Sequence, residues 1–257
     1  MSGGWQADVE LSTDVCTQHE CVDSKLMSAD REKSRKALVL GATGLVGSSL
    51  LNQLLKTDLY GQVYAVTRRP LDFNHPLVTP RLVDFDHIEN DLSGILVDDV
   101  FSCFGTTLKQ AGSKEAFRLV DLEYHLRIAR LVREYAEHYL LVSALGASTS
   151  SRFFYSPAKG ELEQALLAMH FPYTTILRPS LLAGKRREKR FIENMGVKLV
   201  SHMKPLLIGP FSNFASVHAA DVASALLTQA HLVAGGQRSQ TRLVLESSEI
   251  QNQMKFA

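Results

Sequence analysis

Residues 37–56 read ALVLGATGLVGSSLLNQLLK, and this stretch decides the fold. The apolar run at 37–40 predicts a buried strand, and the run at 48–56 predicts a helix. The segment between them is rich in glycine and predicts a tight turn. Strand, glycine turn and helix in this order form the context in which a glycine fingerprint binds a dinucleotide. The alternative is a glycine turn that serves packing alone.

Each glycine of the turn has a distinct expected role. Gly41 allows the tight turn, Gly44 lets a pyrophosphate approach the backbone, and Gly47 lets the helix lie close to the strand. The N–H groups and the dipole at the start of the helix then favour the negative phosphates. The turn therefore predicts that the phosphates of a nucleotide bind at the beginning of the helix.

Length and composition fit a single α/β domain in a reducing compartment. The chain has 257 residues and a formal net charge of +1, so no global field draws it to nucleic acid or to a membrane surface. No apolar stretch is long enough to cross a bilayer. Its three cysteines are too few for a disulfide scaffold in a chain of this length, and this low number predicts a cytoplasmic location. Cys16, His19 and Cys21 lack a fourth ligand, so we predict no metal site.

Residues 1–34 differ from the rest of the chain. They are polar, rich in Asp, Glu and Ser, and show no lasting apolar period, which predicts a disordered extension. The segment lacks the pattern of a secretory signal, and its acidic residues argue against an organellar transit peptide. Residues 35–257 then form one NAD(P)-binding domain, with elements on the substrate side near 180–220.

Short apolar runs alternate with amphipathic stretches from residue 36 onward. This alternation predicts a doubly wound parallel sheet, the Rossmann fold, with a small C-terminal lobe on the substrate side. Ligands of such sheets lie at the carboxyl ends of the strands. The expected strands cover 37–40, 63–66, 81–85, 100–104, 139–143, 173–177 and 242–245, and long helices are expected over about 114–137 and 155–170.

A pair of residues at the start of the second long helix indicates acid chemistry. Tyr155 and Lys159 are four residues apart and therefore share one helical face. An ammonium near a phenol favours the phenolate, which makes the phenol a better proton donor. Ser143 ends the preceding strand, and its hydroxyl could hold a carbonyl oxygen while Tyr155 delivers the proton. The alternative is a surface tyrosine beside a solvated lysine.

The sequence resembles the atypical short-chain dehydrogenase/reductases. The similarity is greatest to their Tat-interacting-protein-like branch, which includes small bacterial NAD(P)-binding oxidoreductases, and it covers about residues 37–230. The motifs that carry it are the glycine turn, Ser143, Tyr155-x-x-x-Lys159, the segment FGTT at 104–107, the segment AGSKEAF at 111–117 and the segment RPS at 178–180.

The resemblance implies a role for each matching residue. Ser143 and Tyr155 would face the substrate, and Lys159 would hold the nicotinamide ribose. The remaining implied cofactor contacts are Gly41, Thr43, Gly44, Leu45 and Val46 at the pyrophosphate, Arg68 at the adenosine ribose, Asp84 and Phe85 at the adenine, Gly105 and Thr106 at the second ribose, and the backbone of Arg178, Pro179 and Ser180 at the carboxamide.

One position departs from the pattern of the superfamily. Many of its dehydrogenases carry an Asn that supports a water relay, and Asp121 stands in what looks like that place. Two hypotheses therefore remain. The chain is an NADPH-dependent reductase of a small carbonyl compound, or it is a catalytically weak NADP(H)-binding protein that engages a protein partner. The resemblance also leaves a homodimer open.

The choice of cofactor depends on the end of the second predicted strand. NAD-binding domains carry an acid about 20 residues past the glycines, where it holds the ribose 2′-hydroxyl. Here the chain reads VTRRP at 66–70, with no acid. Arg68 and Arg69 stand where the carboxylate would be, and guanidinium groups suit a phosphate. We therefore expect NADP(H), against the alternative that both side chains point to solvent.

Overall fold

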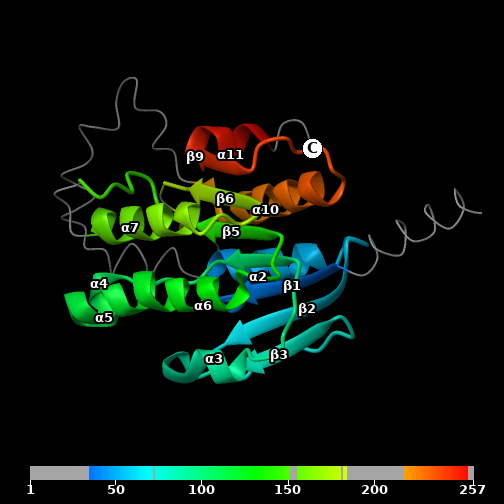
Figure 1. Cartoon of the computed structure of the whole chain (residues 1–257), viewed down its shortest axis with the longest axis horizontal. Coiled ribbons are helices and arrows are strands. Elements are labelled where there is room, and N and C mark those ends of the chain that lie inside the picture. Colours follow the sequence, from blue (N-terminus) through cyan, green and yellow to red (C-terminus); the bar gives the residue numbers. More distant parts are fainter. Residues whose placement is uncertain (1–34, 72, 151–154, 181, 184–216, 254–257) are drawn as a thin grey trace, which may run out of the picture.

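The computed structural model describes residues 35–71, 73–150, 155–180, 182–183 and 217–253 (Figure 1). The predicted extension at 1–34 lies outside the described residues. So does most of the predicted substrate-side segment near 180–220, of which the structure describes a two-stranded parallel sheet formed by β7 (Leu182–Ala183) and β8 (Val217–His218).

Seven parallel strands form the central sheet, in the order β3-β2-β1-β4-β5-β6-β9. The first strand lies in the middle, and the chain winds outward from it in both directions, which confirms the predicted Rossmann fold. The strands are β1 (Arg35–Leu40), β2 (Tyr60–Thr67), β3 (Val78–Leu82), β4 (Asp99–Ser102), β5 (His138–Val142), β6 (Tyr173–Arg178) and β9 (Arg242–Glu246).

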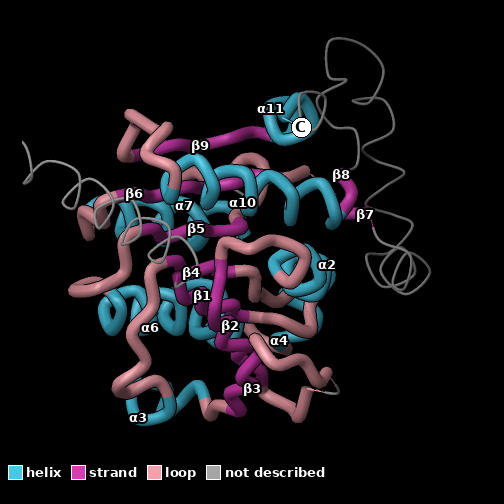
Figure 2. The backbone as a smooth tube through the Cα atoms, turned by 90° about the vertical axis from the view of Figure 1, so that its right-hand side faces the viewer, coloured by secondary structure: helices cyan, strands magenta, loops and turns pink. Residues whose placement is uncertain are grey.

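Helices cover both faces of the sheet (Figures 1 and 2). Side chains of a strand alternate between faces, so a strand buried on both sides must be apolar throughout. In β1, Val39 belongs to one apolar core and Leu38 and Leu40 to the other. The first core is completed by α2 (Leu45–Leu54), α10 (Ala219–Ala234) and α11 (Ser247–Gln253), and the second by α3 (Ile88–Asp91), α6 (Tyr124–Val132) and α7 (Tyr155–Ala168).

The bounds of two predicted elements differ most from the structure. The third strand ends at Leu82, because the Asp84 side chain accepts from the N–H of Asp86 and starts a 3-10 turn. The long helix expected over 114–137 is divided. It consists of α5 (Lys114–Arg118), a π-helical turn η2 (Leu119–Glu123) and α6, and it stops at Val132. The short helix α4 (Leu108–Ala111) precedes the predicted range.

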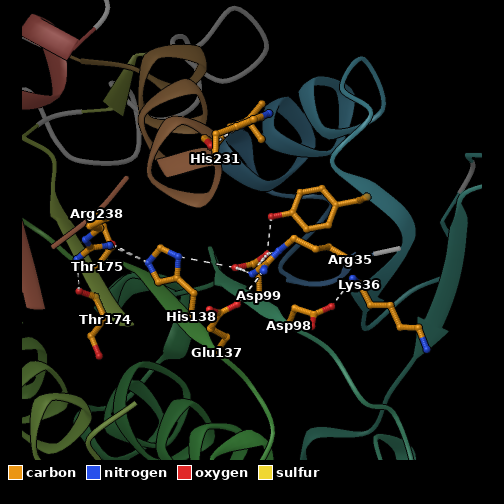
Figure 3. Close-up of polar contacts among 12 residues, drawn as sticks. Arg35, Lys36, Asp98, Asp99, Glu137, His138, Thr174, Thr175, His231 and Arg238 are labelled. Carbon is orange, nitrogen blue, oxygen red and sulfur yellow. Dashed lines mark hydrogen bonds and ion pairs between the residues drawn. The ribbon is translucent and has the colours of Figure 1, made fainter. Parts of the chain in front are cut away.

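A buried polar network joins the amino ends of the strands (Figure 3). Arg35 of β1 binds Asp99 of β4 through Nε and Nη2, at 2.9 and 2.8 Å, and donates to Glu137 through Nη1 at 2.7 Å. The hydroxyl of Tyr60 donates to Asp99 at 2.8 Å. The carboxylate is fully buried, and this desolvation raises the pKa of Asp99 to about 6 although Arg35 opposes the shift.

His138 extends the network toward β6. Its Nε2 lies 3.1 Å from Nη1 of Arg238, and a guanidinium can only donate, so Nε2 accepts and the ring is neutral. Nη1 of Arg238 also donates to the hydroxyl of Thr175 at 2.6 Å. Burial, followed by the charges of Arg238 and Arg35, keeps the pKa of His138 well below its usual range.

These shifts predict that acid destabilises the protein. Burial also holds the pKa of His125 well below its usual value, so below about pH 6.5 the unfolded chain binds protons at His125 and His138 that the folded chain does not. In the folded chain the pKa of Asp99 is raised to about 6. Between about pH 6 and pH 4 the folded chain therefore binds a proton at Asp99 that the unfolded chain does not, and this offsets one of the two histidine protons. We expect the free energy of unfolding to fall by about 1.4 kcal/mol per pH unit for the one net proton.

Urea denaturation between pH 7 and pH 5 measures this dependence. His87 provides a matched control, because it is exposed and its hydrogen bond to Asp84 raises its pKa. A His87→Gln variant should therefore retain the loss of stability in acid, whereas a His138→Gln variant should reduce it. A stability that stays constant or rises toward pH 5 would contradict the assignment of neutral, buried histidines.

Candidate active site

A cleft of about 780 Å³ opens at the carboxyl ends of β1, β2 and β4. This is the edge of a doubly wound sheet at which ligands bind, beside the strand where the winding reverses. Predicted cofactor residues and unpredicted ones share its walls. The lining consists of Gly41, Thr43, Gly44, Val66, Thr67, Arg68, Arg69, Pro70, Phe85, Cys103, Phe104, Gly105, Thr106, Gln110, Ala111, Ala116, Val120 and Tyr124.

The glycine turn forms part of the cleft wall. Gly41 has a positive φ of 77°, and its carbonyl accepts from the N–H of Gly44 at 2.9 Å. A Cβ on Gly47 would lie 2.2 Å from the Gly41 oxygen, so only glycine fits where α2 crosses the turn. Gly44 caps α2 without a side-chain bond, and the first turn of the helix carries no acid. The first N–H groups of α2 therefore suit the phosphates of a nucleotide.

The two predicted arginines also line the cleft. Arg68 and Arg69 follow β2, are exposed, and form no ion pair with any residue that the structure describes. Phe85 lines the same region and packs against Phe104, with ring centroids 5.3 Å apart. Asp84 instead caps the turn at 85–87 and contacts His87 at 3.0 Å. The cleft thus offers two guanidinium groups and an aromatic wall to an adenosine phosphate.

A buried ion pair lies next to the part of the cleft wall formed by Gly105 and Thr106. Nζ of Lys159 lies 2.8 Å from Oδ1 of Asp121, and their side chains are 3% and 1% exposed. The other oxygen of Asp121 accepts from the backbone N–H of Thr106 at 2.7 Å. A Cβ on Gly105 would lie 3.0 Å from Oδ1 of Asp121 and 3.7 Å from Nζ of Lys159. The loop after β4, the π-turn and α7 therefore meet at one carboxylate.

Ser143 has a carboxylate partner as well. Its hydroxyl donates to Oε1 of Glu163, and both residues are buried. Arg178 at the end of β6 binds the same carboxylate through Nη2 at 2.5 Å and through Nε at 3.1 Å, and it binds Glu246 of β9 at 3.0 Å. Hydrogen bonding to Glu163 keeps the guanidinium charged, with its pKa raised above the usual value. The Arg178 side chain thus fixes α7 against the sheet.

The backbone at the end of β6 is engaged by neighbouring segments. The N–H of Ser180 donates to the hydroxyl of Ser247 at 2.6 Å, and the Pro179 carbonyl accepts from the N–H of Leu145 at 3.0 Å. Tyr155 is the first residue of α7, one turn before Lys159, but its side chain lies outside the described part of the chain. Its expected place near the substrate remains a prediction.

Sequence reasoning missed Glu163 and part of the cleft wall. Glu163 lies four residues after Lys159, and a charged residue between the buried Leu162 and Leu166 is the signal that could have identified it. The wall contributed by α4, α5, η2 and α6 carries no such signal, since its residues are small or uncharged: Gln110, Ala111, Ala116, Val120 and Tyr124.

Comparison with known proteins gives a consistent result. A family model described as "NAD dependent epimerase/dehydratase family" matches residues 37–241. "Protein FMP52, mitochondrial" of Debaryomyces hansenii is 36% identical over 165 residues, which cover 62% of this chain and 71% of that protein. "Protein HTATIP2" of Rattus norvegicus is 33% identical over 171 residues, which cover 65% of this chain and 70% of that protein.

Solved structures show the same fold at low sequence identity. A short chain dehydrogenase from Burkholderia cenocepacia in complex with NADP has a TM-score of 0.59 and 16% identity, over 88% of this chain and 93% of that one. A 4-hydroxyisoleucine dehydrogenase complexed with NADH has a TM-score of 0.59 and 15% identity, over 83% and 98%. Similar proteins thus bind either nicotinamide cofactor.

The predicted cytoplasmic location was wrong. Relatives in Debaryomyces hansenii, Meyerozyma guilliermondii and Candida albicans are all named as mitochondrial proteins. The number of cysteines excludes only oxidising compartments, so it could not separate one reducing compartment from another. Within the described ranges, no helix has the length and apolar character that a membrane span requires.

Proposed function

The chain belongs to the NAD dependent epimerase/dehydratase family, and on this basis we propose that it is an NADPH-dependent reductase of a small carbonyl compound. The observation that carries the proposal is one cleft that joins the glycine turn, two arginines and the segment in front of Lys159. Bound NADPH would supply a hydride to the carbonyl carbon. The chain's own groups would bind the phosphates, orient the ribose and deliver the proton.

We assign each role to a residue as the resemblance implies it. The first N–H groups of α2 bind the pyrophosphate, and Lys159 orients the nicotinamide ribose. The hydroxyl of Tyr155 gives its proton to the substrate oxygen as the hydride reaches the carbon, so the carbonyl becomes an alcohol. Ser143 can hold that oxygen only after its hydroxyl turns away from Glu163. Oxidation of NADPH with a panel of aldehydes and ketones tests the proposal.

One observation favours a second candidate function. The polar groups of Ser143 and Lys159 are both held by carboxylates, at Glu163 and Asp121. A site arranged in this way suits a protein that binds NADP(H) as a structural or sensing ligand and engages a protein partner. Tight binding of the nucleotide with no turnover across the carbonyl panel would favour this second function over the first.

We expect Arg68→Ala to remove most of a preference for NADPH over NADH. One charge-assisted hydrogen bond to the 2′-phosphate contributes about 1.5–3 kcal/mol, which corresponds to roughly 10- to 150-fold in affinity. NADH affinity should change little, and the preference should weaken at high salt because Arg68 is exposed. Calorimetric titration of both nucleotides measures these affinities.

Arg81 supplies the control for this experiment. It is also an exposed arginine, but it lies on β3 over the ring of Tyr64 and does not line the cleft. Arg81→Ala should leave the ratio of the two affinities unchanged. Equal affinity of the unmodified protein for NADPH and NADH at low salt would contradict the assignment of the 2′-phosphate site.

We also propose a mitochondrial location, on the basis of the relatives that carry this word in their names. Cell fractionation of the full chain, with matrix and cytosolic marker enzymes followed in parallel, tests the location. Recovery of the protein with the cytosolic marker alone would contradict it.

A further inference from the structure

Three aromatic side chains lie together in the lining of the cleft. They are Phe85, Phe104 and Tyr124, and the ring of Phe85 packs against both others, with its centroid 5.3 Å from Phe104 and 5.1 Å from Tyr124. The ring of Phe104 also stacks on His125, at a centroid distance of 3.8 Å and an interplanar angle of 6°. Nδ1 of His125 in turn contacts the hydroxyl of Ser102 at 2.8 Å. The lining therefore offers fixed aromatic surface to the flat base of a nucleotide.

The segment that carries Phe85 is attached to α6 by one guanidinium group. Nη1 of Arg127 donates to the carbonyl of Phe85 at 3.0 Å, and Nη2 donates to the carbonyl of Asp86 at 2.9 Å. Nε donates to one carboxylate oxygen of Glu89 at 2.7 Å, and Nη2 donates to the other at 2.5 Å. The guanidinium carbon also lies 5.8 Å from the centre of the Tyr124 ring. One side chain therefore contacts two backbone carbonyls, a carboxylate and an aromatic ring.

The backbone contacts of Arg127 go beyond an ordinary ion pair at the surface. The side chains of Arg127 and Glu89 are 26% and 47% exposed, and ion pairs at such positions contribute little to the stability of a protein. The two carbonyls have a different consequence, because the donors of a guanidinium are rigid and planar and therefore fix the chain that they bind. Ile88, the first residue of α3, is fully buried and anchors the next turn in the core. Arg127 thus determines where the Phe85 ring stands relative to α6.

The carboxylate that the resemblance places at the adenine has other partners. One oxygen of Asp84 accepts from the N–H of Asp86 at 3.1 Å, and the other lies 3.0 Å from Nδ1 of His87. The N–H of Asp84 donates to the carboxylate of Asp91 at 2.7 Å. Aromatic rings bind a base through its π-face, which every base has, so stacking alone distinguishes poorly between the groups at the edge of a base.

We propose that Arg127 is a positioning residue that holds Phe85 and Tyr124 in the cleft wall, so that the base of the nucleotide is bound by stacking and the groups at its edge are not recognised. The inference rests on the proposed function, in which the cleft binds NADPH. It adds a residue that does not itself line the cleft to the determinants of cofactor affinity. It also predicts that the amino group of adenine contributes little to that affinity.

Calorimetric titration with two nucleotides tests how the base is bound. In deamino-NADPH, hypoxanthine replaces adenine, so the amino group at the edge is lost while the ring system remains. We expect the unmodified protein to bind NADPH and deamino-NADPH with affinities within about threefold of each other, as stacking predicts. A hydrogen bond from the amino group to the Asp84 carboxylate would instead weaken deamino-NADPH by about tenfold or more. That result would overturn the proposal.

A double-mutant cycle tests the role of Arg127. Arg127→Met keeps an apolar stem but cannot hold the two carbonyls, and Phe85→Leu removes the ring. Each substitution should weaken NADPH binding by about tenfold, through partial loss of base stacking. Because Arg127 acts through the ring, the double variant should lose no more affinity than the weaker-binding single variant. Losses that multiply in the double variant, or an unchanged affinity in Arg127→Met, would contradict this role. If Arg127→Met does not fold, Arg127→Lys carries the same cycle, because it keeps the charge but lacks the planar fork.

Arg130→Met is the matched control, because it removes the same charge from an exposed position on the same helix. It should leave the affinity for NADPH unchanged, and a loss equal to that of Arg127→Met would also overturn the proposal. Binding of NADPH without reduction of any carbonyl compound would contradict the proposed function alone, since these titrations need no substrate. A protein that binds neither nucleotide would contradict both.

Discussion

The Gly44→Val variant is expected to fold and to lose its nucleotide affinity by a factor on the order of 10² to 10⁴. Gly44 has φ −74° and ψ 173°, a conformation open to any residue, and its Cβ would meet only the Gly41 oxygen at 3.2 Å and the Cys103 oxygen at 3.9 Å. The two methyl groups of valine would instead fill the space in front of the α2 N–H groups. Two lost charge-assisted hydrogen bonds account for about 3–6 kcal/mol.

Two further glycine variants separate binding from folding. Gly44→Ala adds one Cβ at the same place and should fold while losing less affinity than Gly44→Val. Gly47→Ala would bring a Cβ to 2.2 Å from the Gly41 oxygen, so it should lower the melting temperature of the protein itself. Calorimetric titration with NADPH and thermal unfolding distinguish the two effects. A folded Gly44→Val protein that binds NADPH as well as the unmodified protein would place the phosphate site elsewhere.

The Tyr155→Phe variant is expected to lower the rate of carbonyl reduction by about 10² to 10⁴, the usual contribution of a positioned general acid. The affinity for NADPH should remain nearly the same, because the phenolic proton serves the substrate and the phosphates bind at α2. Single-turnover oxidation of NADPH measures the chemical step, and calorimetry of the same preparation measures the affinity.

Tyr124 offers a matched control for the loss of a phenol. It also lines the cleft, but its hydroxyl donates to Asp86 at 2.6 Å. Tyr124→Phe should change the rate little. An unchanged rate in Tyr155→Phe, or an equal loss in both variants, would remove Tyr155 from the proposed mechanism.

The fold could be predicted because its signals are local. Residues 37–40 of β1 are apolar and contribute to both cores, and a glycine pattern of this kind occurs where a turn leads from a strand into a helix, so neither signal depends on distant contacts. The ends of strands and helices could be predicted less well where a side chain takes a hydrogen bond that the backbone would otherwise make, or where a helix changes its hydrogen-bond pattern. Asp84 ends the region of the third strand by binding the N–H of Asp86, and the π-turn at 119–123 divides a helix whose apolar pattern looks continuous.

The arrangement of the polar groups in the site could not be predicted. Ser143 and Glu163 are 20 residues apart, and Lys159 and Asp121 belong to different crossovers, so their pairing depends on how the helices pack. Periodicity places a residue on a face of a helix, but it does not identify the partner across from that face. Asp121 illustrates this limit. Its sequence position only questioned the efficiency of a water relay, and the structure adds that its carboxylate contacts the Lys159 ammonium and the loop after β4.

The edge strand β9 makes the completion of the site depend on the order of protein synthesis. Ser247 follows β9 directly and binds the N–H of Ser180, while Glu246 binds Arg178. Because a domain generally folds as a unit, the end of β6 can acquire its final contacts only after Ser247 has been added. A chain that stops before Glu246 would contain the whole glycine turn but would lack these partners of Arg178 and Ser180.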